Sequence, residues 1–353
     1  MDSWKASARE LATVAFMGFY RFCLKRLALL IPVLLGVTIL TFVIARVAIP
    51  NPARAWAGLK ASQSTVEAIA IRYHLNDPIY VQYFYYVFDL LSGDWGTSPV
   101  SGQPVLENLT GFFPATLELS IMAIMIAAVL GIPLGVNAAV KQDKPTDHAI
   151  RLFSLGTYCI PPFLMALVMQ LVVFYWLRLL PSGGRISPFI PPPQRITGLF
   201  VLDSIITGNV QTFQSSLIHI LLPASALALL TFGVITRLTR SSMLEVLRQD
   251  YVRTARSKGL SERVVVFKHA LRNGLISIVT VLALLFATML SGAIVIEYIF
   301  NWPGIGRYAV QSILALDLPA VMGTTLLFAL IVVLVNLVAD IAYAILDPRI
   351  RLD

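Results

Sequence analysis

Six long apolar stretches alternate with polar ones along the 353 residues of this chain. They cover residues 27–49, 114–138, 150–180, 217–238, 278–300 and 320–346. Because a helix of about 20 residues crosses the hydrocarbon of a bilayer, each stretch is predicted to be a transmembrane helix. The expected fold class is therefore all-α, a polytopic membrane protein with six transmembrane helices.

The segments on either side of the first apolar stretch are predicted to contain helices as well. Residues 1–26 carry aromatic side chains beside Lys and Arg, which favours an N-terminal helix in the cytoplasmic interface, with a frayed tail as the alternative. Residues 50–113 are predicted to form an external region of helices and loops. Within it, Ile79 to Leu91 is predicted to be an amphipathic helix that Ser92-Gly93 ends, ahead of a tight turn at Asp94 to Gly96.

Residues 114–353 are predicted to form the core of the protein, from the second transmembrane helix to the sixth. Pro114 is expected to open the second helix. Residues 181–216 are rich in Pro and Gly and are predicted to be an external loop. Residues 239–277 are predicted to be a charged cytoplasmic loop.

Composition agrees with membrane insertion. The chain is 57% hydrophobic and 13% charged, with a mean hydropathy of +0.78, which excludes an ordinary soluble globular protein. Its net charge of +8 comes from basic residues in the loops between helices, which argues against a nucleic-acid surface. With both termini in the cytoplasm, 19 of the 27 Lys and Arg residues lie inside, as the positive-inside rule requires.

Several kinds of chemistry are missing from the sequence. It contains no phosphate-binding G-x-x-x-x-G-K-[ST] motif. The four His residues are scattered, and neither of the two Cys residues lies in a CxxC motif. We therefore expect no metal site, no cofactor and no enzymatic activity in this chain alone.

The segment from Arg248 to Ser277 is a charged island between two apolar stretches. Gln249 to Lys258 lacks Pro and Gly and is predicted to be a short helix, which Gly259 ends by adopting positive φ. A second helix is predicted over Glu262 to Leu271. From charge alone, a segment of this kind lies on the cytoplasmic surface, and neutralisation of anionic headgroups would explain it.

The residues of this island also resemble a known family. YVRTARSKGL followed by KHALRNGL resembles the cytoplasmic EAA loop of ABC importer permeases, in the form found in the dipeptide, oligopeptide and nickel branch. The resemblance implies a coupling helix that docks on a separate ATPase, with small residues allowing close contact. It assigns that docking role to Asp250, Arg253, Thr254, Ala255, Arg256, Lys258 and Gly259. For each basic residue taken singly, contact with lipid phosphate is the simpler alternative.

Other motifs extend the resemblance to the C-terminus. HLNDPIYVQYFYYVFDLLSGDWGTS, GIPLG and DPR are similar to the same branch. Candidates for kinks or for the lining of the pathway are Gly131, Pro133, Pro161, Pro162, Ser291 and Gly292. Small residues permit close helix contact, and Pro breaks the backbone ladder. Ordinary helix packing is the alternative for Gly131 and Pro133, and a packed kink without substrate contact is the alternative for Pro161 and Pro162.

An external turn is expected after the fifth transmembrane helix. The sequence E-x-x-F-x-x-P-G-I-G-R also resembles the peptide branch and supplies Glu297, Pro303, Gly304 and Arg307. Pro303 and the following glycines predict a turn leading into an interfacial or re-entrant helix. We expect Glu297 and Arg307 to form an ion pair that fixes this turn.

The resemblance implies a function and a set of partners. The chain would be one subunit of a type I ABC importer in the cell membrane, forming half of a pathway for peptides. Its partners would be a second permease, two cytoplasmic ATPases that carry the ATP and Mg²⁺, and an external substrate-binding protein. A nearly uncharged pathway would suit varied substrates.

Other readings stay open from the sequence alone. The same architecture could carry oligosaccharides or nickel complexes. An ion-coupled secondary transporter would need intramembrane ionisable pairs, for which Glu297 and Asp340 are the candidates. A membrane scaffold without transport would tolerate disruption of the loop from Thr254 to Gly259.

Overall fold

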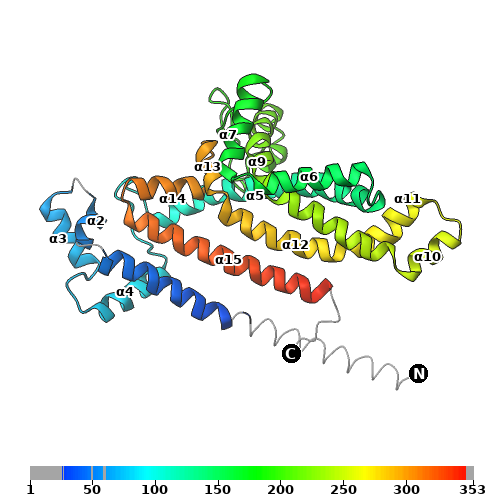
Figure 1. Ribbon diagram of the computed structural model, residues 1–353. Helices are drawn as coiled ribbons and strands as arrows, with labels where there is room; N and C mark the ends of the chain where they lie inside the picture. The colour runs from blue at the N-terminus through cyan, green and yellow to red at the C-terminus, as the bar shows by residue number, and fades with distance from the viewer. Residues whose placement is uncertain (1–25, 27, 49–50, 59–60, 347–353) are drawn as a thin grey trace, which may run out of the picture.

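The computed structural model describes residues 26, 28–48, 51–58 and 61–346 (Figure 1). Throughout this part of the chain every extended regular element is a helix, and strand pairing is limited to a single bridge between Thr97 and Pro104. The all-α fold class is confirmed. The predicted N-terminal helix at 1–26 lies outside the described residues except for Arg26.

Four helices are long and apolar enough to cross a membrane within the described residues. They are Ala28–Arg46, α5 (Val105–Val140), α9 (Val210–Leu247) and Leu318–Val338 of α15 (Leu318–Leu346). Two bent pairs, Pro145–Cys159 with Pro162–Trp176 and Glu262–Leu275 with Ser277–Leu290, bring the number of candidate spans to six if each pair is one span. The predicted polytopic architecture is therefore present, with two of its spans broken.

The region predicted to be external contains three short helices that lie at one end of the molecule (Figure 1). These are α2 (Pro52–Ala57), α3 (Gln63–Arg72) and α4 (Ile79–Ser92). As predicted, α4 stops at Gly93, whose φ of 87° lies in the left-handed region. Tyr86 of α4 packs on Phe42, and its hydroxyl lies 3.1 Å from that of Thr41, which fixes α4 against the first span.

Several helix ends differ from the prediction. The second span does not begin at Pro114, because α5 starts at Val105 and contains that proline. Likewise α9 runs from Val210 to Leu247, where the sequence predicted loops at both ends. Hydropathy marks only the lipid-facing part of a helix. Polar contacts extend the helix beyond it, such as that from the Asn108 amide to the Tyr308 hydroxyl at 3.3 Å.

The remaining helices complete the core. They are α6 (Pro145–Cys159), α7 (Pro162–Met169), η2 (Gln170–Trp176), α8 (Phe200–Ile206), α10 (Asp250–Ser257), α11 (Glu262–Val264), η3 (Val265–Ala270), α12 (Leu271–Gly292), α13 (Ile294–Ile299) and α14 (Ile305–Leu314). The fifth span was predicted over 278–300, but α12 begins earlier and ends at Gly292. The predicted external loop at 181–216 contains α8 and the start of α9.

The centre of the core is the crossing of α5 and α9, which share more contacts than any other pair of helices in the described chain. Small residues bring the two backbones together. A Cβ on Gly135 would lie 2.5 Å from the Cβ of Thr239 and 2.7 Å from the carbonyl oxygen of Thr236. A Cβ on Gly131 would lie 3.0 Å from Ile235. Both glycines therefore serve helix packing, and α5 continues through Pro133 without ending.

We predict that Gly135→Ala destabilises the protein whereas Gly111→Ala does not. Both positions lie inside α5, so both variants gain the same intrinsic helix propensity, up to roughly 1 kcal/mol. Only at Gly135 does the new methyl group overlap a neighbouring helix, at a cost of roughly 1–3 kcal/mol. Thermal unfolding of the detergent-solubilised protein measures both. Equal melting temperatures for the two variants would contradict the tight crossing.

Candidate coupling surface and outer polar core

The predicted unit of helix, glycine turn and helix is present at the end of the molecule opposite α2 and α3 (Figure 1). Val252 and Ala255 of α10 are buried against Val265 and Val266 of η3 and against the inner ends of α5 and α9. This apolar contact attaches α10 rigidly to the two helices that form the core.

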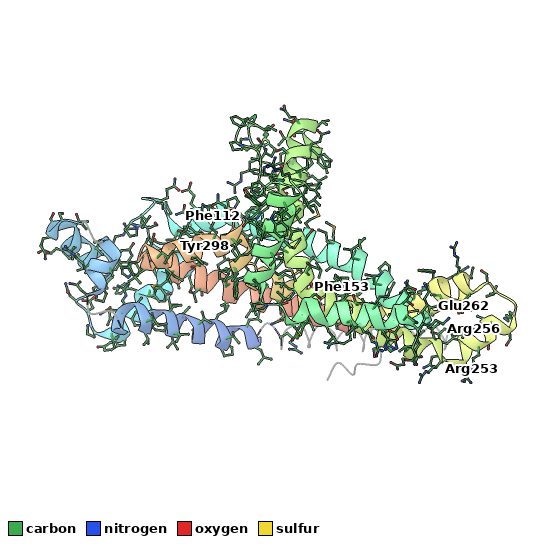
Figure 2. The ribbon with its side chains drawn as sticks, turned by 45° about the horizontal axis from the view of Figure 1, so that its top comes forward. Phe112, Phe153, Arg253, Arg256, Glu262 and Tyr298 are labelled. Atoms are coloured by element: carbon green, nitrogen blue, oxygen red, sulfur yellow. The ribbon has the colours of Figure 1, made fainter. Side chains whose placement is uncertain are left out.

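The opposite face of α10 is exposed and polar (Figure 2). The side chain of Arg253 is 72% exposed, and Thr254 and Lys258 are exposed beside it. Asp250 lies 3.4 Å from Arg253, an exposed pair of little energetic value. This surface can therefore offer its charges to a partner at little cost.

Arg256 has a partner within the chain. Its guanidinium donates to both carboxylate oxygens of Glu262, with Nη2 to Oε1 at 2.7 Å and Nε to Oε2 at 3.2 Å. These bonds raise the pKa of Arg256 above its ordinary value. They join α10 to α11 across the turn, so Arg256 is placed to hold the shape of the docking unit.

Ala255 and Gly259 are both small, but their positions in the fold require a small residue for different reasons. Ala255 faces inward, so the sequence argument that its size admits a partner does not fit its place in the fold. Gly259 adopts φ +75°, and a Cβ there would meet nothing within 4 Å. Its role is conformational, because L side chains rarely adopt this φ.

The paired prolines produce a corner instead of a kink. Pro161 caps α7 and Pro162 is its first residue, and α7 with η2 turns by 107° from α6. Neither proline supplies the N–H that would continue α6. Both are exposed, and their predicted contact with the pathway stays a prediction.

In the fifth span, α12 ends at Gly292, directly after Ser291, and α13 begins at Ile294.

The external turn is built around the carboxylate of Glu297, which is fully buried. It accepts hydrogen bonds from the Thr116 hydroxyl at 2.6 Å and from the backbone N–H of Arg307 at 3.0 Å. Gly304 leaves room for it, because a Cβ there would collide with the carboxyl group. Pro303 precedes that glycine, and α14 begins directly after it, so the helix predicted after the turn is present, while its interfacial or re-entrant place stays a prediction.

The predicted ion pair between Glu297 and Arg307 was wrong. Within the described chain the Arg307 guanidinium donates instead to the carbonyl oxygen of Asn301, at 3.4 Å, and only its backbone N–H reaches the carboxylate. The loop folds back over the buried carboxylate, so the backbone N–H of Arg307, and not its guanidinium, comes within hydrogen-bonding distance of Glu297. Sequence proximity alone could not distinguish the backbone from the side chain.

A second buried carboxylate escaped the sequence analysis. The carboxylate of Glu118 in α5 accepts hydrogen bonds from Nε and Nη2 of Arg185 at 2.9 and 2.6 Å. It also accepts one from the backbone N–H of Val201 at 2.7 Å. The guanidinium also donates to the carbonyl oxygen of Gly198 at 2.6 Å and stacks 3.7 Å from the ring centre of Phe200. An acid inside a predicted span was the signal that could have found this pair.

Asp203 of α8 organises the loop that carries Arg185. Its carboxylate accepts the backbone N–H groups of Ile196, Thr197 and Gly198 and the Thr197 hydroxyl, at 2.7–3.2 Å. Burial alone would raise the pKa of Asp203, but these four bonds hold it below its ordinary value. Among the described residues, no three His, Cys, Asp or Glu side chains gather in a way that could hold a metal ion.

Comparison with known families decides the class of protein. Residues 131–352 match the family of binding-protein-dependent transport system inner membrane components, and residues 19–120 match its N-terminal domain. The chain belongs to this family. It is a multi-pass membrane permease, as the sequence motifs predicted.

Curated relatives match over nearly their whole length. The chain is 43% identical to a probable D,D-dipeptide transport system permease of Escherichia coli, over 95% of this chain and 98% of the relative. It is 42% identical to a dipeptide permease of Alkalihalophilus pseudofirmus, over 94% and 99%. It is 38% identical to an oligopeptide permease of Bacillus subtilis, over 94% and 99%.

We predict that Glu297→Gln destabilises the protein and that Arg307→Gln has little effect. An amide in place of the carboxylate turns one of its two acceptors into a donor that faces another donor, at a cost of roughly 1–3 kcal/mol. Arg307→Gln keeps the backbone N–H and should stay within about 0.5 kcal/mol. Thermal unfolding in detergent compares them. An equal loss of thermal stability in the two variants would instead support an ion pair between Glu297 and Arg307.

Proposed function

We propose that this chain is the transmembrane subunit of an ATP-driven importer and forms half of the pathway for dipeptides and oligopeptides. A second permease supplies the other half, an external binding protein delivers the peptide, and two cytoplasmic ATPases carry the ATP and Mg²⁺. The chain itself is not an enzyme. Both of its termini lie in the cytoplasm.

The exposed face of α10 is the observation that carries the coupling role. A subunit without a nucleotide site receives mechanical work only through a rigid contact. Arg253, Thr254 and Lys258 are exposed on a helix whose other face is locked to α5 and α9. The basic groups suit acidic residues on an ATPase, since complementary charge guides and orients association.

The substrate class is inferred from the relatives. Three permeases at 38–43% identity, matched over at least 98% of their lengths, are named for dipeptide or oligopeptide transport. Substrates of this kind vary in side chain but share a peptide backbone and two charged ends.

We predict that the double substitution Arg253→Glu and Lys258→Glu releases the ATPases and leaves the second permease bound. Reversing two exposed charges turns attraction into repulsion without disturbing Val252 or Ala255, and should weaken docking at least about tenfold. Affinity purification of the solubilised importer measures both partners. Lys144→Glu, at an exposed position where α6 begins, is the matched control. Retention of the ATPases by the double variant would contradict docking on α10.

We predict ATP-dependent uptake of a labelled dipeptide into proteoliposomes that contain the full set of partners. An oligosaccharide and a nickel complex should not be taken up. Collapsing ion gradients with an ionophore should leave the rate unchanged, because ATP hydrolysis drives the cycle. Uptake that survives without ATP and stops with the ionophore would instead identify an ion-coupled transporter.

A further inference from the structure

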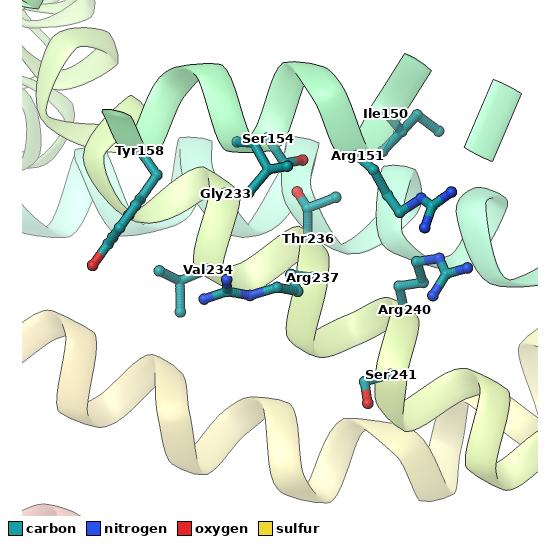
Figure 3. Close-up of a pocket in the computed structure, with 11 residues that line it drawn as sticks. Ile150, Arg151, Ser154, Tyr158, Gly233, Val234, Thr236, Arg237, Arg240 and Ser241 are labelled. Atoms are coloured by element: carbon teal, nitrogen blue, oxygen red, sulfur yellow. The ribbon is translucent and has the colours of Figure 1, made fainter. Parts of the chain in front are cut away.

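A cavity of about 310 Å³ opens between α6 and α9 (Figure 3). Sites for small molecules usually measure roughly 300–1,000 Å³. Three arginines line it, Arg151, Arg237 and Arg240, together with apolar side chains such as Leu155 and Val234. The three guanidinium groups are not equivalent.

Two of the arginines are engaged with one buried acid. Arg240 donates Nε and Nη2 to the two carboxylate oxygens of Asp147, both at 2.7 Å. Arg151 lies 3.6 Å from the same carboxylate. Asp147 is fully buried, so this cluster fastens α6 to α9, and its two guanidinium groups and one carboxylate keep a net charge of +1.

Arg237 differs from both. It is exposed, and it makes no hydrogen bond or ion pair with any residue in the described part of the chain. Figure 3 shows its side chain running back along α9 toward Val234 and Tyr158, away from Arg151 and Arg240. One unpaired guanidinium therefore points into the apolar end of the cavity.

The direction of the Arg237 side chain helps to decide between a lipid headgroup and a water-soluble ligand. Arg237 lies ten residues before the end of α9 at Leu247, roughly 15 Å along the helix axis. A long basic side chain beside hydrocarbon reaches toward the membrane surface, because an unpaired charge in lipid costs roughly 2.5–3.5 kcal/mol. Arg237 instead extends toward Val234 and away from the end of α9 at Leu247. This orientation fits a water-filled path better than a lipid headgroup.

Two residues with buried hydroxyl groups lie beneath the surface of the cavity. Ser154 and Thr236 line it and are more than nine-tenths buried, and their hydroxyls have no partner among the described residues. Buried hydroxyls usually find a partner. Because both hydroxyl oxygens are themselves almost inaccessible to solvent, they are not placed to bind a ligand in the cavity, and recognition there falls to the arginines.

We propose that this cavity is part of the inner translocation pathway and that Arg237 binds the C-terminal carboxylate of the passing peptide. The proposal rests on the proposed function. A guanidinium presents a planar pair of N–H donors that matches a carboxylate. Every free peptide carries that carboxylate whatever its side chains, so one arginine can serve a varied set of substrates.

The test compares two peptides that differ only at this end. A labelled dipeptide and its C-terminal amide are each loaded onto the binding protein beforehand, so that the preference of that protein does not enter. Uptake by the complete importer in proteoliposomes is then measured. Arg237→Gln should slow the free-carboxylate peptide about fivefold and leave the amide unchanged, while Arg237→Lys keeps most of the rate. Lys141→Gln, at an exposed basic residue at the end of α5 and outside the cavity, should change neither.

Each other outcome contradicts the proposal in its own way. Equal slowing of both peptides would make Arg237 a structural residue, and no change in either would place the cavity off the pathway. An anionic phospholipid retained by the wild type and lost from Arg237→Gln, with uptake intact, would identify a lipid site. If the wild type carries neither peptide, the proposed function fails and this inference fails with it.

Discussion

Buried carboxylates that accept backbone N–H groups hold the outer half of this structure together. The chain folds irregular segments against long apolar helices, and a backbone donor without water needs a partner. Glu118 accepts the N–H of Val201, Glu297 that of Arg307, and Asp203 those of the loop before α8. A buried carboxylate is itself unfavourable unless fully bonded. Each acid therefore supplies the acceptor that its loop needs, and each loop supplies the donors that its acid needs.

The inner half is held in a different way. There α10 attaches through small apolar side chains to α5 and α9, and its charges remain on the surface. Because α9 is continuous over 38 residues, roughly 57 Å along its axis, a force applied at α10 reaches the outer loops through one helix. The tight glycine contacts with α5 make the two helices move together. A partner that binds α10 would therefore contact a segment that is packed on both α5 and α9.

The sequence was sufficient for the elements and insufficient for their contacts. Hydropathy predicted the spans, and Gly93 and Gly259 correctly predicted two helix ends, because a positive φ is a local property. The ends of α5 and α9 were missed, since polar contacts with distant segments extend them. The partner of Glu297 was misassigned because backbone donors leave no trace in sequence. Arg185 was missed because its acid lies 67 residues away.

The distribution of free charge changes the expected picture of an uncharged pathway. The buried acids Glu118, Asp203 and Glu297 already have partners, so none of them offers a peptide an unpaired carboxylate to bind. Asp147 likewise satisfies Arg240 at the inner end. Among the three arginines of the described cavity, Arg237 is the one whose guanidinium has no partner in the described chain. A transporter built this way leaves recognition of side chains to the binding protein and tests only the feature that all of its substrates share.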